Sequence, residues 1–381
     1  MIKKLIATLL AGLMPLCLAL PSLAVEQLSD IPATSAVLIE QTTGEVLFEK
    51  NSHQHVAPAS ITKIMTMLLV MEEMEKGNLS IDDKLTCSEY ASHMGGSEIW
   101  LELGEQMSVE DLLKAVFIAS ANDAAVVFAE HIAGSEDEFV NRMNKRAKEM
   151  CLEDTNFVNC TGFDEQGHYT SAYDVAKMAG ALMQYPLVTK YATIWIDTLR
   201  GGKTELTNTN RLVRFYNGIT GLKTGHTDEA GSCLCATATR NNLKLISVVM
   251  KCQSISLRNI WSARLLDYGF ANFEFTAVPS VDPQLLPIKV SNGIEPIAEI
   301  YAEYPNGILL PKGSSSKIEQ DVTIVEKLTA PIDINQNVGK VVVSIDGKPL
   351  TEYVIKTKYA IPKMTFSKAM LMLFKKVIQT N

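Results

Sequence analysis

The segment Ala57-Pro-Ala-Ser60-Ile-Thr-Lys63 places a hydroxyl and an amine three residues apart. Apolar residues recur at helical spacing over positions 59–75, so both side chains would point from one face of a helix. A serine hydroxyl is a poor nucleophile unless a base takes its proton. A lysine can be that base when burial or a neighbouring cation lowers its pKa. We therefore predict that Ser60 is a nucleophile and Lys63 its general base.

This spacing alone is a weak signal, because Ser314-Ser-Ser-Lys317 has the same spacing. The second copy sits among turn residues, so we expect a solvated loop there. The prediction for Ser60 needs support from other polar groups in the chain.

A second candidate is Ser120-Ala-Asn122, which follows Ser60 by 60 residues. It interrupts an apolar, Ala-rich helical stretch over 110–132, where a serine and an asparagine could simply cap a helix. In a catalytic site, Ser120 would relay a proton and Asn122 would hold a substrate amide. By itself the pattern favours the cap.

A third candidate is Lys223-Thr224-Gly225-His226, which contains the only Lys-Thr-Gly of the chain. The charge of Lys223 and the hydroxyl of Thr224 can both bind a carboxylate. Glycine beside a strand would let a substrate backbone approach closely. A surface turn is the alternative for any single copy of this pattern.

The elements that must position these groups follow from hydrophobic periodicity. We expect a hairpin over 35–50, an amphipathic helix over 136–151, alternating strands over 218–250 with a buried strand at 243–251, and a helix over 256–268. Residues 276–362 are rich in Val, Ile, Thr and Pro and carry regular turn signals, which indicates a small all-β unit. The 381 residues thus predict a mixed unit over 25–275 and a β unit over 276–362.

The first 24 residues have the layout of a secretory signal peptide. Two lysines precede an apolar run, and Ser22-Leu-Ala24 offers small residues for cleavage after Ala24. An uncleaved anchor helix is the alternative, because the apolar run is nearly long enough to span a membrane. Lys3 and Lys4 are the only charged residues of this segment, so its removal takes the formal net charge from −8 to −10. That charge argues against a nucleic-acid partner.

The last residues, 363–381, contain four lysines and no acid. Phe366, Met370, Leu373, Phe374 and Val377 would fall on one helical face, with Lys368, Lys375 and Lys376 opposite or beside it. We expect a basic amphipathic helix lying on a membrane surface. The alternative is a terminal helix docked on the β unit.

The six cysteines that follow the signal segment leave two possibilities open. Export permits disulfides, yet a chain of this length does not need them to fold, and buried free thiols are at least as well supported. The histidines and cysteines lack the spacing of zinc ligands, so we expect no metal.

The three motifs occur together in the order Ser-x-x-Lys, Ser-x-Asn, Lys-Thr-Gly, which is the signature of penicillin-interacting serine enzymes. With PASITKIMT, ASANDAAV, NCTGFDEQGHYTSAYD (159–174) and GLKTGHT, the chain resembles the D-alanyl-D-alanine carboxypeptidases, low-molecular-mass penicillin-binding proteins of peptidase family S11. The resemblance covers about 30–275 strongly. It implies an α+β fold: a β-lactamase/transpeptidase-like domain with an antiparallel sheet flanked by helices, then a small all-β domain and a C-terminal amphipathic helix.

The resemblance also implies a role for each motif residue. Ser60 would attack the carbonyl of the penultimate D-alanine of a peptidoglycan pentapeptide, with Lys63 as base, and β-lactams would inhibit it covalently. Ser120 would pass a proton to the leaving amine, and Asn122 would hold the substrate amide. Lys223 and Thr224 would bind the terminal carboxylate.

Three further assignments come from the resemblance. The backbone N–H groups of Ser60 and of His226, the residue that follows Gly225, would form the oxyanion hole. Arg258 would lend positive charge at the carboxylate, and Asp174 would support deacylation. No cofactor is expected. The exported protein would be attached to the outer face of the cytoplasmic membrane.

Two other functions fit parts of this pattern. A class A β-lactamase shares the motifs, but it would need a glutamate-bearing loop, and Asp164, Glu165 and Asp174 do not form one here. A wall-binding protein without strong catalysis is the other alternative, although every motif residue is present.

Overall fold

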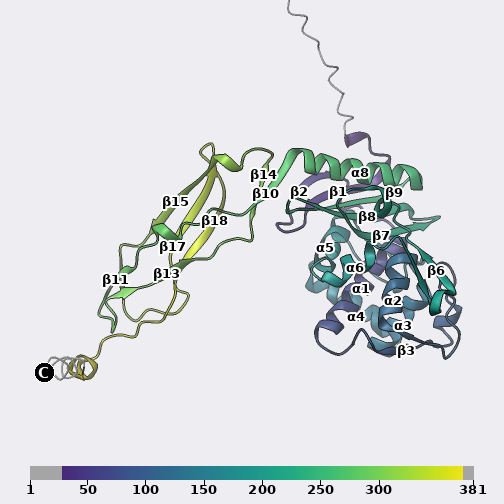
Figure 1. Cartoon of the computed structure of the whole chain (residues 1–381), viewed down its shortest axis with the longest axis horizontal. Helices are drawn as coiled ribbons and strands as arrows, with labels where there is room; N and C mark the ends of the chain where they lie inside the picture. Colours follow the sequence, from purple (N-terminus) through teal and green to yellow (C-terminus); the bar gives the residue numbers. More distant parts are fainter. Residues whose placement is uncertain (1–27, 372–381) are drawn as a thin grey trace, which may run out of the picture. The chain divides into compact units, whose positions relative to one another are not determined.

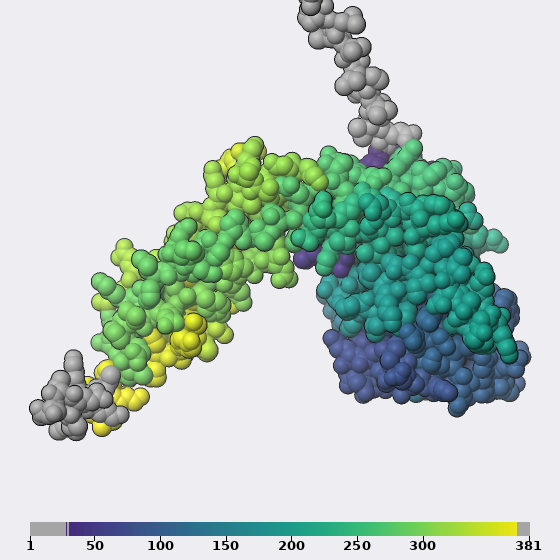
Figure 2. Space-filling view, viewed as in Figure 1, coloured from purple at the N-terminus to yellow at the C-terminus, as the bar shows by residue number. Residues whose placement is uncertain are grey.

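The computed structural model describes residues 28–371. The signal segment predicted over 1–24 and the end of the predicted amphipathic helix, 372–381, lie outside the described residues. Two parts of the chain each pack around a hydrophobic core of their own, one before and one after about residue 273. Figures 1 and 2 show the two parts, the second in green to yellow.

The first part is built on a five-stranded antiparallel sheet with the strand order β2-β1-β9-β8-β7. Its strands are β1 (Ala33–Glu40), β2 (Val46–Lys50), β7 (Ile219–Thr227), β8 (Gly231–Arg240) and β9 (Leu243–Cys252). The predicted hairpin over 35–50 and the buried strand over 243–251 are confirmed as β1–β2 and β9. Because β7 lies at an edge of the sheet, the Lys-Thr-Gly motif on it has one side free of a neighbouring strand.

Helices cover both faces of this sheet (Figure 1). α8 (Ile255–Asn272) packs on one face, and α5 (Ala172–Leu182) and α6 (Pro186–Ala192) pack on the other. The remaining helices are α1 (Lys63–Glu75), α2 (Val109–Lys114), α3 (Asn122–Ala133), α4 (Glu136–Glu149) and the short α7 (Leu212–Phe215). Two hairpins complete this part: β3 (Lys84–Thr86) with β4 (Gln106–Ser108), and β5 (Ile196–Leu199) with β6 (Thr204–Thr207).

Serine caps set the beginnings of several helices. The hydroxyl of Ser135 accepts the N–H of Glu138 at the start of α4, and Ser171 and Ser254 cap α5 and α8 in the same way. Such a cap satisfies one of the N–H groups that a helix leaves unpaired at its start. The capping serines therefore fix where these helices begin.

The predicted helices over 59–75 and 110–132 are present but interrupted where the candidate residues lie. A 3₁₀ turn, Ala59–Thr62, precedes α1, and a π turn, Ala115–Ala119, separates α2 from Ser120. π turns inside helices are rare and concentrate at functional sites. The local sequence thus departs from regular helix at the predicted nucleophile and at the predicted proton relay.

The second part is all-β, as predicted. A four-stranded sheet has the order β13-β18-β17-β15, with β13 (Ile300–Ala302), β15 (Ile318–Ile324), β17 (Asn337–Ile345) and β18 (Lys348–Thr357). A three-stranded sheet contains β11 (Ile288–Ser291), β12 (Ile297–Ala298) and β16 (Lys327–Thr329). β10 (Phe273–Thr276) pairs with β14 (Ile308–Pro311), so the boundary that we placed at 275/276 falls inside a strand of this part.

The second Ser-x-x-Lys pattern lies in this part, at the 3₁₀ turn Ser315–Lys317. Lys317 is exposed and pairs with Asp346 on the surface, as expected for a solvated loop. At the described end of the chain, residues 366–371 are helical, and Phe366, Met370 and Leu371 are exposed. No helix within residues 28–371 is long and apolar enough to cross a membrane.

Candidate active site

Ser60 and Lys63 are in contact at the start of α1, as the motif spacing predicts. The Nζ of Lys63 lies 3.0 Å from Ser60 Oγ, and it donates hydrogen bonds to Asn122 Oδ1 at 2.6 Å and to the carbonyl of Thr161 at 2.7 Å. Once deprotonated, the amine keeps two N–H bonds for Asn122 and Thr161. Its lone pair then faces the hydroxyl of Ser60, which is the geometry a general base needs.

Burial makes Lys63 able to act as that base. Its side chain is fully buried, which lowers its pKa from 10.5 to about 7, against the opposing influence of Cys160 and Asp123. Desolvation disfavours the ammonium form and so increases the fraction of neutral amine near pH 7. The arrangement can therefore take a proton from Ser60 at neutral pH.

Two glycines let the backbone before Ser60 take its position. Ala59 has a φ of +48°, a left-handed conformation that is costly for a residue with a side chain. A Cβ on Gly162 would lie 1.9 Å from the carbonyl oxygen of Ala59, and one on Gly225 would lie 2.9 Å from that of Pro58. Gly225 thus admits the segment that carries Ser60, and because it also lines the cavity, the predicted approach of a substrate backbone stays a prediction.

Ser120 and Lys223 form a second hydroxyl–amine pair. Ser120 follows the π turn with a φ of +66°, and it accepts a hydrogen bond of 2.8 Å from Lys223 Nζ. Lys223 is buried, which holds its pKa well below the usual range, with further lowering from the charges of Lys63 and Arg258. Ser120 is thus placed to exchange a proton with a buried amine.

Asn122 begins α3 and is buried, with both ends of its amide occupied. Its Oδ1 accepts from Lys63, and its Nδ2 donates to the carbonyl of Gly95 at 2.8 Å. It does not line the cavity described below. In this structure Asn122 orients the amine of Lys63, a contact that bridges 59 residues of sequence and that the motif alone did not predict.

Six of the candidate residues line a cavity of about 660 Å³. Its lining includes Ser60, Ser120, Thr224, Gly225, His226 and Arg258 from the predicted set. It also includes residues that the sequence analysis did not select: Ser97, Trp195, Thr207, Asn208, Thr209, Arg211, Arg214, Phe215 and Ile255. Three arginines and no carboxylate line it, so the cavity suits an anionic ligand.

Arg258 lies in α8, and its guanidinium reaches the sheet. Nη1 donates to the carbonyl of Cys233 at 3.1 Å and contacts that of Gly225 at 3.5 Å. Burial lowers its pKa to about 10, and Arg211 is the cation that adds to this lowering. Arg258 is therefore positioned beside Thr224 and Gly225, as expected for a carboxylate-binding residue.

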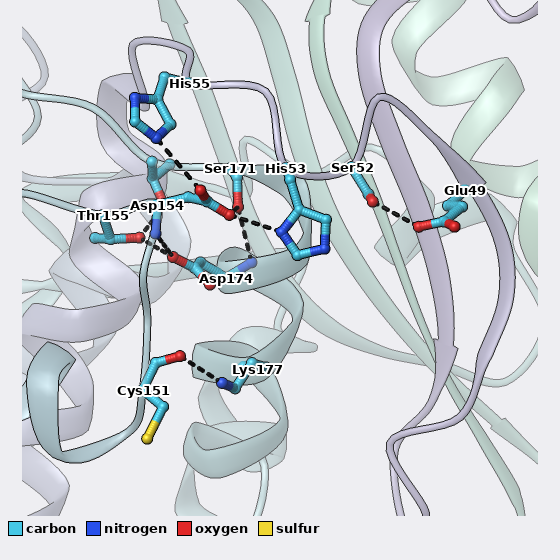
Figure 3. A network of polar contacts seen from close by, with 11 residues as sticks. Glu49, Ser52, His53, His55, Cys151, Asp154, Thr155, Ser171, Asp174 and Lys177 are labelled. Carbon is cyan, nitrogen blue, oxygen red and sulfur yellow. Dashed lines mark hydrogen bonds and ion pairs between the residues drawn. The ribbon is translucent and has the colours of Figure 1, made fainter.

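Asp174 takes part in a hydrogen-bond network that no residue of the cavity lining shares, and its expected role in deacylation stays a prediction. Its Oδ2 accepts hydrogen bonds from the N–H of Asp154 at 2.9 Å and from Thr155 Oγ1 at 2.7 Å. Figure 3 shows this network, in which Asp154 also contacts His53 and His55. Because Asp174 does not line the cavity, the structure assigns it to holding the turn at Asp154 and Thr155.

The six cysteines within the described residues are free thiols, which favours the interpretation without disulfides. Five are buried and Cys151 is exposed. Burial raises the pKa of Cys87 and of Cys233 to about 11, so neither is a reactive thiolate at neutral pH. Within residues 28–371 no three His, Cys, Asp or Glu residues gather as a metal site.

Two family models match the chain. The model described as D-alanyl-D-alanine carboxypeptidase (Peptidase_S11) matches residues 22–254, and the model of the C-terminal domain of penicillin-binding protein 5 matches residues 273–363. The second match begins at the first residue of β10.

Known proteins match over most of the chain. It is 43% identical over 374 residues to the D-alanyl-D-alanine carboxypeptidase DacF of Bacillus subtilis, covering 96% of each chain. The structure of penicillin-binding protein 5 from Haemophilus influenzae matches with a TM-score of 0.79 and 33% identity, over 87% of this chain and 98% of that one. A Streptomyces K15 DD-transpeptidase mutant matches with a TM-score of 0.60 and 27% identity, over 63% and 98%. The chain therefore belongs to the D-alanyl-D-alanine carboxypeptidase family of S11 peptidases.

Proposed function

We propose that this protein is a serine-type D-alanyl-D-alanine carboxypeptidase that removes the terminal D-alanine of peptidoglycan stem peptides and is acylated by β-lactams. The contact between Ser60 and the buried amine of Lys63, at the wall of a cationic cavity, carries this proposal. Family membership and the names of the relatives support it.

In the proposed reaction, Lys63 takes the proton of Ser60, and Ser60 Oγ attacks the carbonyl of the penultimate D-alanine. The backbone N–H groups of Ser60 and His226 stabilise the oxyanion, at about 3 kcal/mol for each donor. The C–N bond then breaks, and the leaving amine receives a proton through Ser120, which Lys223 contacts. Water hydrolyses the ester and regenerates Ser60.

The C-terminal D-alanine of the substrate would bind through its carboxylate. Thr224 and Arg258 line the cavity and offer a hydroxyl and a cation that fit this group, and the buried amine of Lys223 contacts Ser120 beside them. An arginine beside a carboxylate forms charge-assisted hydrogen bonds, which are about twice as strong as neutral ones. The terminal carboxylate thereby fixes which peptide bond lies next to Ser60.

The proposal predicts that the protein releases D-alanine from a peptide ending in D-Ala-D-Ala. Free D-alanine is assayed with the full chain, and penicillin hydrolysis is followed in parallel. We expect D-alanine release that a β-lactam abolishes, together with slow penicillin turnover because the acyl-enzyme persists. Steady penicillin hydrolysis without D-alanine release would instead indicate a β-lactamase. No turnover of either compound would leave only wall binding.

We further propose that the protein is exported and held at the outer face of the cytoplasmic membrane by the basic amphipathic segment 363–381. The exposed apolar residues Phe366, Met370 and Leu371 in the described start of this helix support the proposal. An apolar face with flanking lysines binds anionic lipid surfaces.

Deletion of 363–381 is therefore expected to abolish co-sedimentation with vesicles that contain anionic lipids. D-alanine release in solution should be retained, which separates membrane attachment from catalysis. Undiminished sedimentation of the shortened chain would contradict the proposed attachment.

A further inference from the structure

Arg211 and Arg214 are two exposed cations at the cavity. The proposed carboxypeptidase mechanism assigns no role to either of them. Both line the same cavity as Ser60, Thr224 and Arg258. Across residues 28–371, neither guanidinium has a hydrogen bond or an ion pair, and no carboxylate lines the cavity. A substrate that ends in D-alanine offers one carboxylate, which the proposed mechanism assigns to Lys223, Thr224 and Arg258.

The segment that carries these arginines is held rigidly by two buried asparagines. Asn208 Nδ2 donates to the carbonyls of Ala192 and Ile194 at 3.0 and 2.8 Å. Asn210 Nδ2 donates to the carbonyl of Gly221 at 3.1 Å, and its Oδ1 accepts the N–H of Leu212. A site held in this way loses little conformational freedom when a ligand binds.

Aromatic rings hold the head group of Arg214 at the cavity. Its guanidinium carbon lies 5.6 Å from the ring centre of Trp195 and 5.3 Å from that of Phe215. Both rings line the cavity, and cation–π attraction favours this placement. The charge of Arg214 is thus directed at the cavity although the side chain is exposed.

Two observations place Arg211 at the carboxylate-binding end. Thr209, two residues before Arg211, accepts a hydrogen bond of 2.8 Å from Thr224 Oγ1. Arg211 is also close enough to Arg258 to disfavour its charged form. Arg211 therefore adjoins the groups assigned to the terminal carboxylate, which belongs to the leaving amine, and Arg214 lines the same cavity three residues further along the chain.

We propose that Arg211 and Arg214 form a subsite for a second carboxylate on the amine component of the reaction, so that the enzyme releases or accepts dicarboxylic amino acids in preference to their uncharged amide analogues. This inference rests on the proposed carboxypeptidase function. In the forward direction the amide C–N bond breaks, the Ser60 ester forms and the dicarboxylic amine leaves with one proton. In the reverse direction that amine attacks the ester, and Ser60 recovers its proton.

The test compares peptides that differ by one charged group. Three substrates share one N-terminal part and end in D-Ala-D-Glu, D-Ala-D-Gln or D-Ala-D-Ala, and release of the terminal amino acid is measured. A fourth and a fifth substrate both end in D-Ala-D-Ala, and they carry Glu and Gln, respectively, on the acyl side of the scissile bond. We expect kcat/KM for D-Ala-D-Glu to exceed that for D-Ala-D-Gln about 10-fold, because hydrogen bonds between arginine and a carboxylate are stronger than neutral ones and exposure to solvent reduces this difference.

The double variant Arg211→Gln/Arg214→Gln should bring the Glu/Gln ratio on the leaving side close to one. Arg142→Gln, an exposed arginine of α4 that does not line the cavity, is the matched control and should keep the wild-type ratio. A wild-type ratio near one, or a preference that survives the double variant, would overturn the subsite. So would an arginine-dependent preference only for acyl-side Glu. Failure of the wild type to release any terminal amino acid would instead overturn the proposed function.

Discussion

Replacing Lys63 with methionine is expected to slow acylation of Ser60 by roughly 10²- to 10⁴-fold, the range that a positioned general base contributes. Methionine has a similar length and suits a fully buried site, so the change removes the base with little loss of packing. The rate of covalent labelling by a β-lactam reports the acylation step directly.

Two controls separate the loss of the base from a loss of structure. The Lys63→Met chain leaves Asn122 Oδ1 and the carbonyl of Thr161 without their donor, so its thermal unfolding must be measured beside that of the wild type. Lys63→Arg keeps donors but stays protonated, and it should label as slowly as Lys63→Met. Labelling at the wild-type rate in either folded variant would contradict the assignment of Lys63.

The pH dependence of the wild type tests the same assignment. Burial lowers the pKa of Lys63 to about 7, and only the neutral amine accepts a proton. The acylation rate should therefore rise with pH through about 7 and level off above it. A rate that falls as the pH rises from 6 to 8 would show that the protonated amine is the active form.

Substituting Gly162 with alanine is expected to reduce acylation by about 10²-fold or more, although this glycine is not a candidate catalytic residue. The new Cβ would lie 1.9 Å from the carbonyl oxygen of Ala59 and 2.9 Å from the nitrogen of Ser60, at a φ of +93°. The backbone that carries the nucleophile must then move, and a displacement of about 1 Å can cost 10²-fold in rate. The rate of β-lactam labelling measures the loss.

Gly167→Ala is the matched control for Gly162→Ala. Gly167 lies in the same loop with a φ of +88°, but its added Cβ would meet nothing closer than 3.9 Å. Both substitutions carry the strain of a left-handed alanine, and only the first adds the collision. Equal labelling rates in the two variants would show that the collision does not reach Ser60.

The sequence allowed the main elements of the site to be predicted because its signals are local. The spacing of Ser60 and Lys63, within a run of apolar residues at helical spacing, places both side chains on one helical face. The apolar run over 243–251 likewise indicated a buried strand, which β9 confirms. The order of the three motifs then indicated the family, which the comparisons confirm.

The rest depended on contacts between distant segments. The bonds from Lys63 to Asn122 and Thr161 bridge 59 and 98 residues, so no local pattern reveals them. The role in deacylation expected for Asp174 came from the resemblance of residues 159–174 to the family. The sequence did not reveal that the carboxylate of Asp174 accepts hydrogen bonds from Asp154 and Thr155.

The arginine subsite was missed for a related reason. Exposed arginines are common on any surface, and nothing in the local sequence of Arg211 and Arg214 separates them from solvated charges. Only the cavity shows that they share a wall with Ser60. The burial of Asn208 and Asn210, whose amides hold this segment by hydrogen bonds, is likewise visible only in the structure.

The most direct test of the mechanism is to find which residue a β-lactam acylates. The full chain is labelled, digested and analysed by mass spectrometry, beside a Ser60→Ala chain shown to unfold at the wild-type temperature. One adduct per chain on the peptide that contains Ser60, absent from Ser60→Ala, is the predicted result. An adduct on another residue, or undiminished labelling of folded Ser60→Ala, would contradict Ser60 as the nucleophile that Lys63 activates.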